Sequence, residues 1–320
     1  MSETNPRRRV SAVIRAYNEG KHIGRLLEGF EQQTVKPDEI ILVDSGSTDD
    51  TVEIARAAGC RIVHIDKSEF SFGRALNRGC AAATGEVLLF ASAHVYPLYN
   101  THVEHLVGAF DRDGVAIAYG RQVGDARTKF SESRVMLKWF PNQNIWDQRH
   151  PFSNNANAAV LKSLWQESPY DEALTGLEDL DFAKKALAAG HKIAYVADAP
   201  IVHVHEESWS IIRNRYRREA MAYARIVEGS NMSLPEAVGL SLSNIASDYT
   251  HAVKSRRLRG NVLGIPMFRF AQFMGAWQGF REPNHVSARL LEHFYYPPDS
   301  GSHAAPPEPG RKIEYRQAPP

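Results

Sequence analysis

The 320-residue chain is poor in cysteine and nearly balanced in charge. Its two cysteines, Cys60 and Cys80, are too few to build a disulfide framework, which favours a reducing cytoplasm. The formal net charge is +1, so we do not expect a partner such as nucleic acid or another general polyanion. Basic residues still cluster locally, and those clusters need a separate explanation.

Long apolar runs are also missing. Residues 1–9 are polar and basic and lack the apolar core of a signal peptide. No stretch reaches the roughly 18 apolar residues that a membrane-spanning helix requires. We therefore expect a protein that lies in the cytoplasm or on the inner face of the cell membrane, and that does not cross it.

Two nucleotide-binding motifs are absent as well. The chain has no Gly-x-Gly-x-x-Gly turn, which argues against a dinucleotide-dependent dehydrogenase. The segment that follows the first apolar run, Arg15-Ala16-Tyr17-Asn18-Glu19, is not a Gly-rich phosphate loop, which argues against a nucleotidyltransferase.

Apolar runs alternate with helix-like segments through the first third of the chain. The strand-like runs cover 10–14, 39–43, 61–65 and 86–90. The helix-like segments between them cover 23–30, 51–58 and 73–83. This alternation predicts an α/β fold with a mostly parallel central sheet flanked by helices.

The second half has a different organisation. Helical segments are expected at 180–189 and 209–228, and strands at 192–196 and 201–205. We divide the chain into a flexible N-terminus (1–9), an α/β domain (10–206, with halves 10–97 and 98–206), a helical C-terminal extension (207–296) and a loosely draped Pro-rich tail (297–320).

Polar residues follow three of the predicted strands. They are Ala16-Tyr17-Asn18-Glu19 after the first, Asp44-Ser45 after the second, and Ser92-Ala93-His94 after the strand at 86–90. In open α/β sheets, ligands bind beyond the carboxyl ends of the strands. The layout is typical of a nucleotide-sugar site.

The motifs and their order resemble those of glycosyltransferase family 2, whose members invert the sugar and have the GT-A fold. The matching segments are Tyr17-Asn18-Glu19, Val43-Asp44-x-Gly46-Ser47-Thr48-Asp49, Ser92-Ala93-His94 with Pro97, and Gly176-Leu177-Glu178-Asp179-Leu180-Asp181. The resemblance covers roughly residues 10 to 206. It implies that a sugar moves from a nucleotide-diphosphate donor to a hydroxyl of a glycan or lipid-linked saccharide.

The resemblance also implies a set of nucleotide contacts. The candidates are Ala16, Tyr17, Asn18, Glu19, Asp44, Ser45, Arg74, Asn77, Ser92 and Ala93. Each has a structural alternative: Asp44 is also suited to a turn that caps the next helix, and Arg74 to a surface salt bridge. Ser45 stands where the family often has a second Asp that pairs with the base.

Ser92-Ala93-His94 occupies the place of the family's Asp-x-Asp metal motif. His94 is suited to bind a divalent ion such as Mn²⁺ or Mg²⁺, with His203 or His205 completing the site. Two alternatives remain open: His94 contacts the diphosphate or sugar without metal, or it is structural. The departure also raises the alternative of a non-catalytic nucleotide- or glycan-binding relative.

Glu178 and Asp179 begin a predicted helix. An inverting transfer needs one base to remove the proton of the acceptor hydroxyl. By resemblance Asp179 is that base, and Glu178 orients the acceptor or the base. The structural alternative is the capping of a helix N-terminus by acidic side chains. The polar loop 151–157 suits sugar hydroxyls and tight turns equally well.

Basic and aromatic residues meet in segment 254–281. Such a combination suits contact with an anionic membrane surface, and it suits equally packing against the main domain or a partner subunit of a homodimer.

Overall fold

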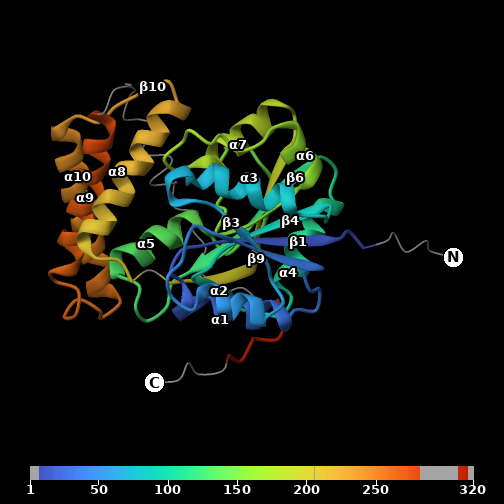
Figure 1. The fold of residues 1–320 in the computed structure, drawn as a ribbon. Helices are drawn as coiled ribbons and strands as arrows, with labels where there is room; N and C mark the ends of the chain where they lie inside the picture. Colours follow the sequence, from blue (N-terminus) through green and yellow to red (C-terminus); the bar gives the residue numbers. More distant parts are fainter. Residues whose placement is uncertain (1–6, 205, 282–308, 316–320) are drawn as a thin grey trace.

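The computed structural model describes residues 7–204, 206–281 and 309–315. Helices cover both faces of a central sheet, and three long helices stand together at one side (Figure 1). The predicted α/β fold with a helical extension is confirmed.

The strands are β1 (Val10–Ala16), β2 (Glu39–Asp44), β3 (Arg61–His64), β4 (Val87–Ser92), β5 (Val95–Pro97), β6 (Val115–Val123), β7 (Ile145–Gln148), β8 (Asn157–Leu161), β9 (Lys192–His203) and β10 (Gly229–Ser230). The α-helices are α1 (Gly20–Glu31), α2 (Thr51–Ala57), α3 (Phe72–Ala82), α4 (His102–Gly108), α5 (Phe130–Trp139), α6 (Lys162–Glu167), α7 (Glu178–Ala188), α8 (Trp209–Ile226), α9 (Leu234–Lys254) and α10 (Gly264–Arg281). Two short 3-10 helices are η1 (Lys67–Glu69) and η2 (Ala109–Asp111).

The sheet has the strand order β3-β2-β1-β4-β8-β6-β9-β5, and β7 pairs with β9. β1 is parallel to β2 and β4, and β2 is parallel to β3, as the alternation predicted. β8 is antiparallel to both β4 and β6, whereas β6 and β9 are parallel. The carboxyl ends of β1, β2, β4, β6 and β9 therefore lie at one edge of the sheet, and this edge carries the candidate site.

The core has two layers because side chains alternate across the sheet. On one face, Ala12 and Ile14 of β1 pack in a cluster with Leu26 of α1. On the other face, Val13 packs in a cluster with Leu76 of α3. All four are at most 1% exposed. Burial on both faces explains the nearly continuous apolar sequence of these strands.

The two strands predicted at 192–196 and 201–205 form one strand, β9, that continues to His203. Its pairing with β6 is irregular: Gly120 lies opposite Val196, and Gln122 lies opposite Ile201. The extra residues form a bulge that contains Pro200, which has no N–H group to donate to the ladder. The sequence pattern breaks at this proline, but the strand does not.

The helical extension packs closely because two glycines face a neighbouring helix. A Cβ atom at Gly275 or Gly279 of α10 would lie 2.2 Å from the carbonyl oxygen of Arg213 or Arg217 of α8, respectively. The two helices approach through their backbones. None of the described helices is both long and apolar enough to span a lipid bilayer.

The end of the chain also packs against the α/β domain. Ile313 is 5% exposed and donates its N–H to the carbonyl of Leu98. The ring of Tyr315 lies edge-to-face on Tyr96, with 5.0 Å between the ring centroids. For residues 309–315, the expectation of a loosely draped tail is wrong.

A buried ion pair joins the helices of the extension. Arg269 of α10 binds both carboxylate oxygens of Asp248 of α9, at 2.7 Å from Nε and 3.0 Å from Nη2. Each side chain is 2% exposed. The same carboxylate lies 3.6 Å from Nε of Arg134 in α5. One carboxylate therefore connects three helices.

We predict that Asp248→Ala lowers the free energy of unfolding by about 3–5 kcal/mol, because it leaves a buried guanidinium without its counterion. Urea unfolding monitored by circular dichroism measures this loss. Asp147→Ala is the control, since the pair of Asp147 with Arg149 is exposed and contributes less than about 1 kcal/mol. Equal losses in the two variants would contradict the prediction.

Candidate functional site

A cavity of about 690 Å³ opens at the carboxyl edge of the sheet. Arg15 of β1, Ser92 of β4, Gln122 of β6 and His203 of β9 line its floor at the strand ends, as expected for an open α/β sheet. Residues of α5, α7 and α8 form its other walls. The site therefore combines the α/β domain with the helical extension.

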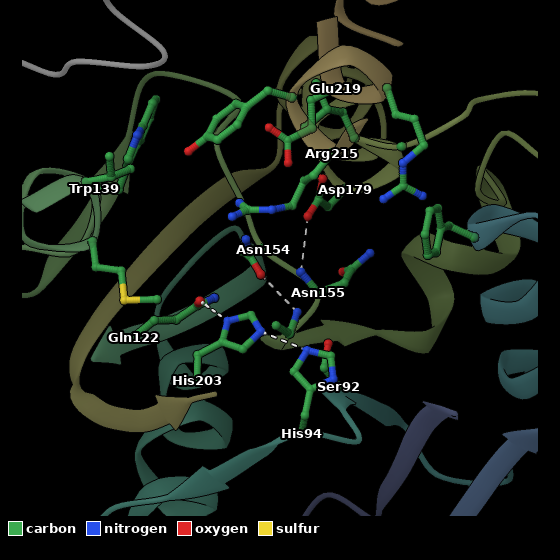
Figure 2. A pocket seen from close by; sticks show the side chains of 18 of the residues that line it. Ser92, His94, Gln122, Trp139, Asn154, Asn155, Asp179, His203, Arg215 and Glu219 are labelled. Carbon is green, nitrogen blue, oxygen red and sulfur yellow. Dashed lines mark hydrogen bonds between the residues drawn. The ribbon is translucent and has the colours of Figure 1, made fainter. Parts of the chain in front are cut away.

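Asp179 points into this cavity from the first turn of α7 (Figure 2). Its Oδ2 accepts a hydrogen bond from the backbone N–H of Asn155 at 3.2 Å, and its Oδ1 accepts one from the N–H of Leu180 at 2.8 Å. Burial, together with the neighbouring charge of Glu178, raises its pKa to about 7. A carboxyl group in this range is suited to proton transfer near neutral pH.

Glu178 has a different environment although it is the adjacent residue. Its Oε1 accepts a hydrogen bond from Nη1 of Arg15 at 3.0 Å, and the residue is 5% exposed. The guanidinium of Arg15 also lies over the ring of Phe72, 4.9 Å from its centroid. Leu177 has a left-handed φ of 54°, which turns the chain sharply into α7. That turn brings both carboxylates inward.

His94 and His203 meet through their Nε2 atoms, which are 3.1 Å apart. On the far side of each ring, Nδ1 of His94 faces Oε1 of Glu19 at 2.8 Å, and Nδ1 of His203 faces Oε1 of Gln122 at 2.7 Å. Figure 2 shows the contact of His203 with Gln122 and with His94. When both Nδ1 atoms donate to these oxygens, the two Nε2 lone pairs are available to one ligand between the rings.

The three candidate metal ligands have different outcomes. His94 and His203 lie together, as predicted, whereas His205 lies outside the described residues. In the motif before His94, Ser92 lines the cavity and Ala93 is 1% exposed with its side chain in the core.

The loops after β1 and β2 are bonded to each other beside the cavity. Oδ1 of Asn18 accepts the N–H of Thr48, and the hydroxyl of Ser45 donates to the carbonyl of Ala16. Tyr17 is 48% exposed, and Nζ of Lys67 donates to its hydroxyl.

Asp44 is 2% exposed and accepts hydrogen bonds from the N–H groups of Gly46 and Ser47. Its Oδ2 also lies 3.2 Å from Nδ1 of His64. Burial alone would raise the pKa of Asp44, but the hydrogen bonds from Ser47, Gly46 and His64 hold it below the usual value. The carboxylate forms the turn that the sequence offered as an alternative. Its contact with a nucleotide remains a prediction.

Arg74 and Asn77 of α3 face another segment of the chain. Nε of Arg74 donates to Oε2 of Glu172 at 2.7 Å, and the amide of Asn77 donates to Oε1 of Glu172 and to the carbonyl of Tyr170. Neither residue lines the cavity. In this structure their side chains hold the 170–172 segment against α3, and a nucleotide contact stays a prediction.

The sequence did not reveal several residues that line the cavity. Arg215 of α8 binds Oε1 of Glu132 and Oε2 of Glu207, each at 2.7 Å. Arg218 of the same helix also lines the cavity. The run of arginines from 213 to 218 was a visible signal, but the phase of the helix decides which of them face inward. Arg213 instead donates to Gln278 of α10.

The loop at 151–157 does reach the cavity through Asn154 and Asn155. Oδ1 of Asn155 accepts the hydroxyl of Tyr170, while its Nδ2 is buried with no hydrogen-bond partner among the described residues. Nε2 of Gln122 is likewise buried and has no hydrogen-bond partner among the described residues. Buried donors of this kind are normally satisfied, so they indicate room for a polar ligand.

Nearby, the rings of Trp139 and Phe152 stack with 4.4 Å between their centroids. Both side chains line the cavity. Buried amide donors and a stacked aromatic pair therefore occupy the same chamber.

Comparison with known proteins places this geometry among enzymes that transfer sugars. Residues 11–167 match the family model described as "Glycosyl transferase family 2". The chain is 29% identical over 209 residues to the O-antigen chain rhamnosyltransferase RfbN of Salmonella typhimurium, covering 62% of this chain and 67% of that protein. It is 27% identical to the O-antigen chain rhamnosyltransferase WbaN of Salmonella anatum, covering 60% of this chain and 65% of the relative. The chain thus spans about two thirds of the length of these relatives.

Solved structures share the fold. The mannosyltransferase PcManGT of Pyrobaculum calidifontis, in complex with GDP-Man and Mn²⁺, superposes with a TM-score of 0.60 at 17% identity, covering 86% of this chain and 87% of that one. Glucosyl-3-phosphoglycerate synthase of Mycobacterium tuberculosis, in complex with Mn²⁺, UDP and phosphoglyceric acid, gives a TM-score of 0.53 at 22% identity over 70% of this chain and 82% of that one. At these identities the likeness concerns the fold alone. From the family match and the rhamnosyltransferase relatives together, we conclude that residues 11–167 of the chain belong to glycosyltransferase family 2.

Proposed function

We propose that the protein transfers a sugar, with inversion, from a nucleotide-diphosphate donor to a hydroxyl of a saccharide or lipid-linked saccharide, with Asp179 as the general base. The observation that carries this proposal is the environment of Asp179: it is half-buried at the cavity wall and accepts hydrogen bonds from two backbone N–H groups, and desolvation raises its pKa to about 7. A carboxylate that only caps an exposed helix end does not require a place in a cavity wall or a raised pKa.

The neighbouring groups suit this role. Arg15 forms an ion pair with Glu178, so its guanidinium offsets the charge of the carboxylate next to Asp179. The N–H groups of Asn155 and Leu180 fix the orientation of the Asp179 carboxylate. An acceptor hydroxyl in the cavity can then donate its proton to Asp179 while its oxygen attacks the sugar carbon from the side opposite the leaving diphosphate.

The donor is expected beside the loops after β1, β2 and β4. The relatives named as rhamnosyltransferases support a deoxyhexose as the transferred sugar. The loops that contain Asn18 and Asp44 are fixed by hydrogen bonds: Asn18 binds the N–H of Thr48, and Asp44 binds the N–H groups of Gly46 and Ser47. They therefore offer the nucleotide a surface whose shape is already set.

The acceptor is expected in the chamber between α5, the 151–157 loop and α8. Sugars present hydroxyl groups around an apolar ring face, so they suit stacked aromatic rings flanked by amide groups. Trp139 and Phe152 supply the rings, and the buried Nδ2 of Asn155 supplies an unpaired donor. These features support a saccharide acceptor.

The residues at the His94–His203 pair fit a divalent ion. The Nε2 atoms of His94 and His203, 3.1 Å apart, would hold such an ion between them. Metal-binding imidazoles usually donate their other N–H to an oxygen, as both rings do here toward Glu19 and Gln122.

The described residues contain no group of three His, Cys, Asp or Glu side chains arranged for a metal. We therefore infer that oxygen atoms of the nucleotide-sugar substrate complete the coordination. An ion held there would offset the negative charge of the departing diphosphate.

We predict that Asp179→Asn lowers kcat by about 10²–10⁴-fold, because the amide cannot accept the proton of the acceptor hydroxyl. Donor binding should stay within about threefold of the wild type, since the side chain keeps its size. Steady-state kinetics and calorimetric titration of the donor measure the two effects. Asp181→Asn is the control, because Asp181 pairs with Lys185 and does not line the cavity. A non-catalytic binder would be indifferent to both changes.

The pH profile gives a second prediction. Because the pKa of Asp179 is raised to about 7, the base is protonated below that pH and ionised above it. We expect kcat/KM to rise about tenfold per pH unit below about 7 and to level off above it. Glu178→Gln should move this limb to lower pH, since it removes the neighbouring negative charge. A profile that stays flat down to pH of about 5 would exclude Asp179 as the titrating base.

Metal removal gives a third prediction. We expect UDP, GDP or dTDP, titrated by calorimetry, to bind at least about tenfold more weakly in EDTA than with Mn²⁺. His94→Ala and His203→Ala should abolish the Mn²⁺ effect, whereas His191→Ala, remote from the cavity, should retain it. Tight binding that EDTA leaves unchanged would contradict the metal and indicate that basic side chains hold the diphosphate instead.

A further inference from the structure

The turn between α9 and α10 exposes apolar and basic side chains together. It lies at the end of the helical extension opposite β10, at the lower left of Figure 1. We call this surface the α9–α10 tip. Its exposed apolar residues are Val253, Val262, Leu263, Met267 and Phe270, and its exposed basic residues are Lys254, Arg256, Arg257 and Arg259.

The apolar side chains of the tip are unusually accessible. Leu263 is 75% exposed and Val253 is 58% exposed. Leu263, Met267 and Phe270 follow i, i+4, i+7 spacing, so they continue one face along the start of α10. Removing such a face from water is favourable by the hydrophobic effect. In the part of the chain that the structure describes, this face stays exposed to solvent.

The charge of the tip has one sign. Residues 249–281 include no Asp or Glu, and Asp248, just before them, is already bound to the buried Arg269. The chain as a whole carries a formal charge of only +1. The local excess of cations therefore belongs to this turn and not to a generally basic surface.

Arg256 stands at a position that glycine normally occupies. It has a left-handed φ of 56°, immediately after the C-cap Ser255 of α9. Glycine is usual there because side chains strain the left-handed conformation. The side chain of Arg256 is exposed to solvent, so it adds to the cations of the turn.

We propose that the α9–α10 tip docks the protein on an anionic lipid surface. The cations match the negative headgroups, and the apolar side chains match the boundary between headgroups and acyl chains. A second copy of this chain is a poorer occupant, because a two-fold contact would set one cluster of cations against the other. The proposal does not depend on the identity of the base or the metal.

Vesicle flotation of the full chain tests the docking. We expect binding to vesicles of phosphatidylcholine mixed with phosphatidylglycerol, weak binding to phosphatidylcholine alone, and loss of binding in high salt. The double variant Arg256→Gln/Arg259→Gln should lower the affinity about 25-fold, at roughly fivefold per cation. Leu263→Ser/Phe270→Ser should lower it at least about tenfold.

Two controls match these variants. Arg56→Gln removes an exposed arginine from α2, and Leu234→Ser removes a leucine that is 46% exposed at the opposite end of α9. Both should bind vesicles like the wild type. Equal binding to neutral and anionic vesicles, or unchanged binding by the tip variants, would overturn the proposal. Sedimentation that shows a dimer dissolved by the same variants, with no binding to vesicles, would overturn it in favour of self-association.

Discussion

The ion pair between Arg15 and Glu178 determines the chemistry of the cavity. It joins the end of β1 to the first turn of α7 across 163 positions in the sequence. Two adjacent buried carboxylates would otherwise repel each other and exclude the turn that brings them inward. The hydrogen-bond donors that contact Asp179 among the described residues are neutral backbone N–H groups. Burial and the charge of Glu178 raise the pKa of Asp179 to about 7, and the charge of Arg15 opposes this rise. The two adjacent carboxyl groups therefore have different surroundings: one binds a guanidinium, and the other is suited to exchange a proton.

Much of the fold could be predicted because its signals are local. The alternation of strand and helix in the first third gave the parallel part of the sheet, and polar residues at strand ends located the edge with the cavity. The pairing of His94 with His203 was anticipated by analogy with a family motif. The partners of these residues were not, since Gln122 and Arg15 reach the site only through the strand order. No spacing along the chain encodes that order.

The errors have equally physical causes. Two strands were predicted at 192–196 and 201–205, but a bulge that contains Pro200 joins them within β9. The composition of the C-terminal tail suggested a loose segment, whereas Ile313 is buried and Tyr315 packs on Tyr96. On α8, the sequence does not tell which arginines line the cavity, because that depends on the phase of the helix: Arg215 faces the cavity and Arg213 contacts α10. Each error concerns a contact between distant segments.

The glycines of α10 have a consequence for how such an enzyme can change. Gly275 and Gly279 bring the backbones of α8 and α10 together, so α8 is positioned from behind by main-chain contact. The opposite side of α8 carries Arg215 and Arg218, which line the cavity. The position of these two side chains therefore depends on the backbone contact behind them. Larger residues at either glycine would force the two helices apart and displace this wall of the cavity.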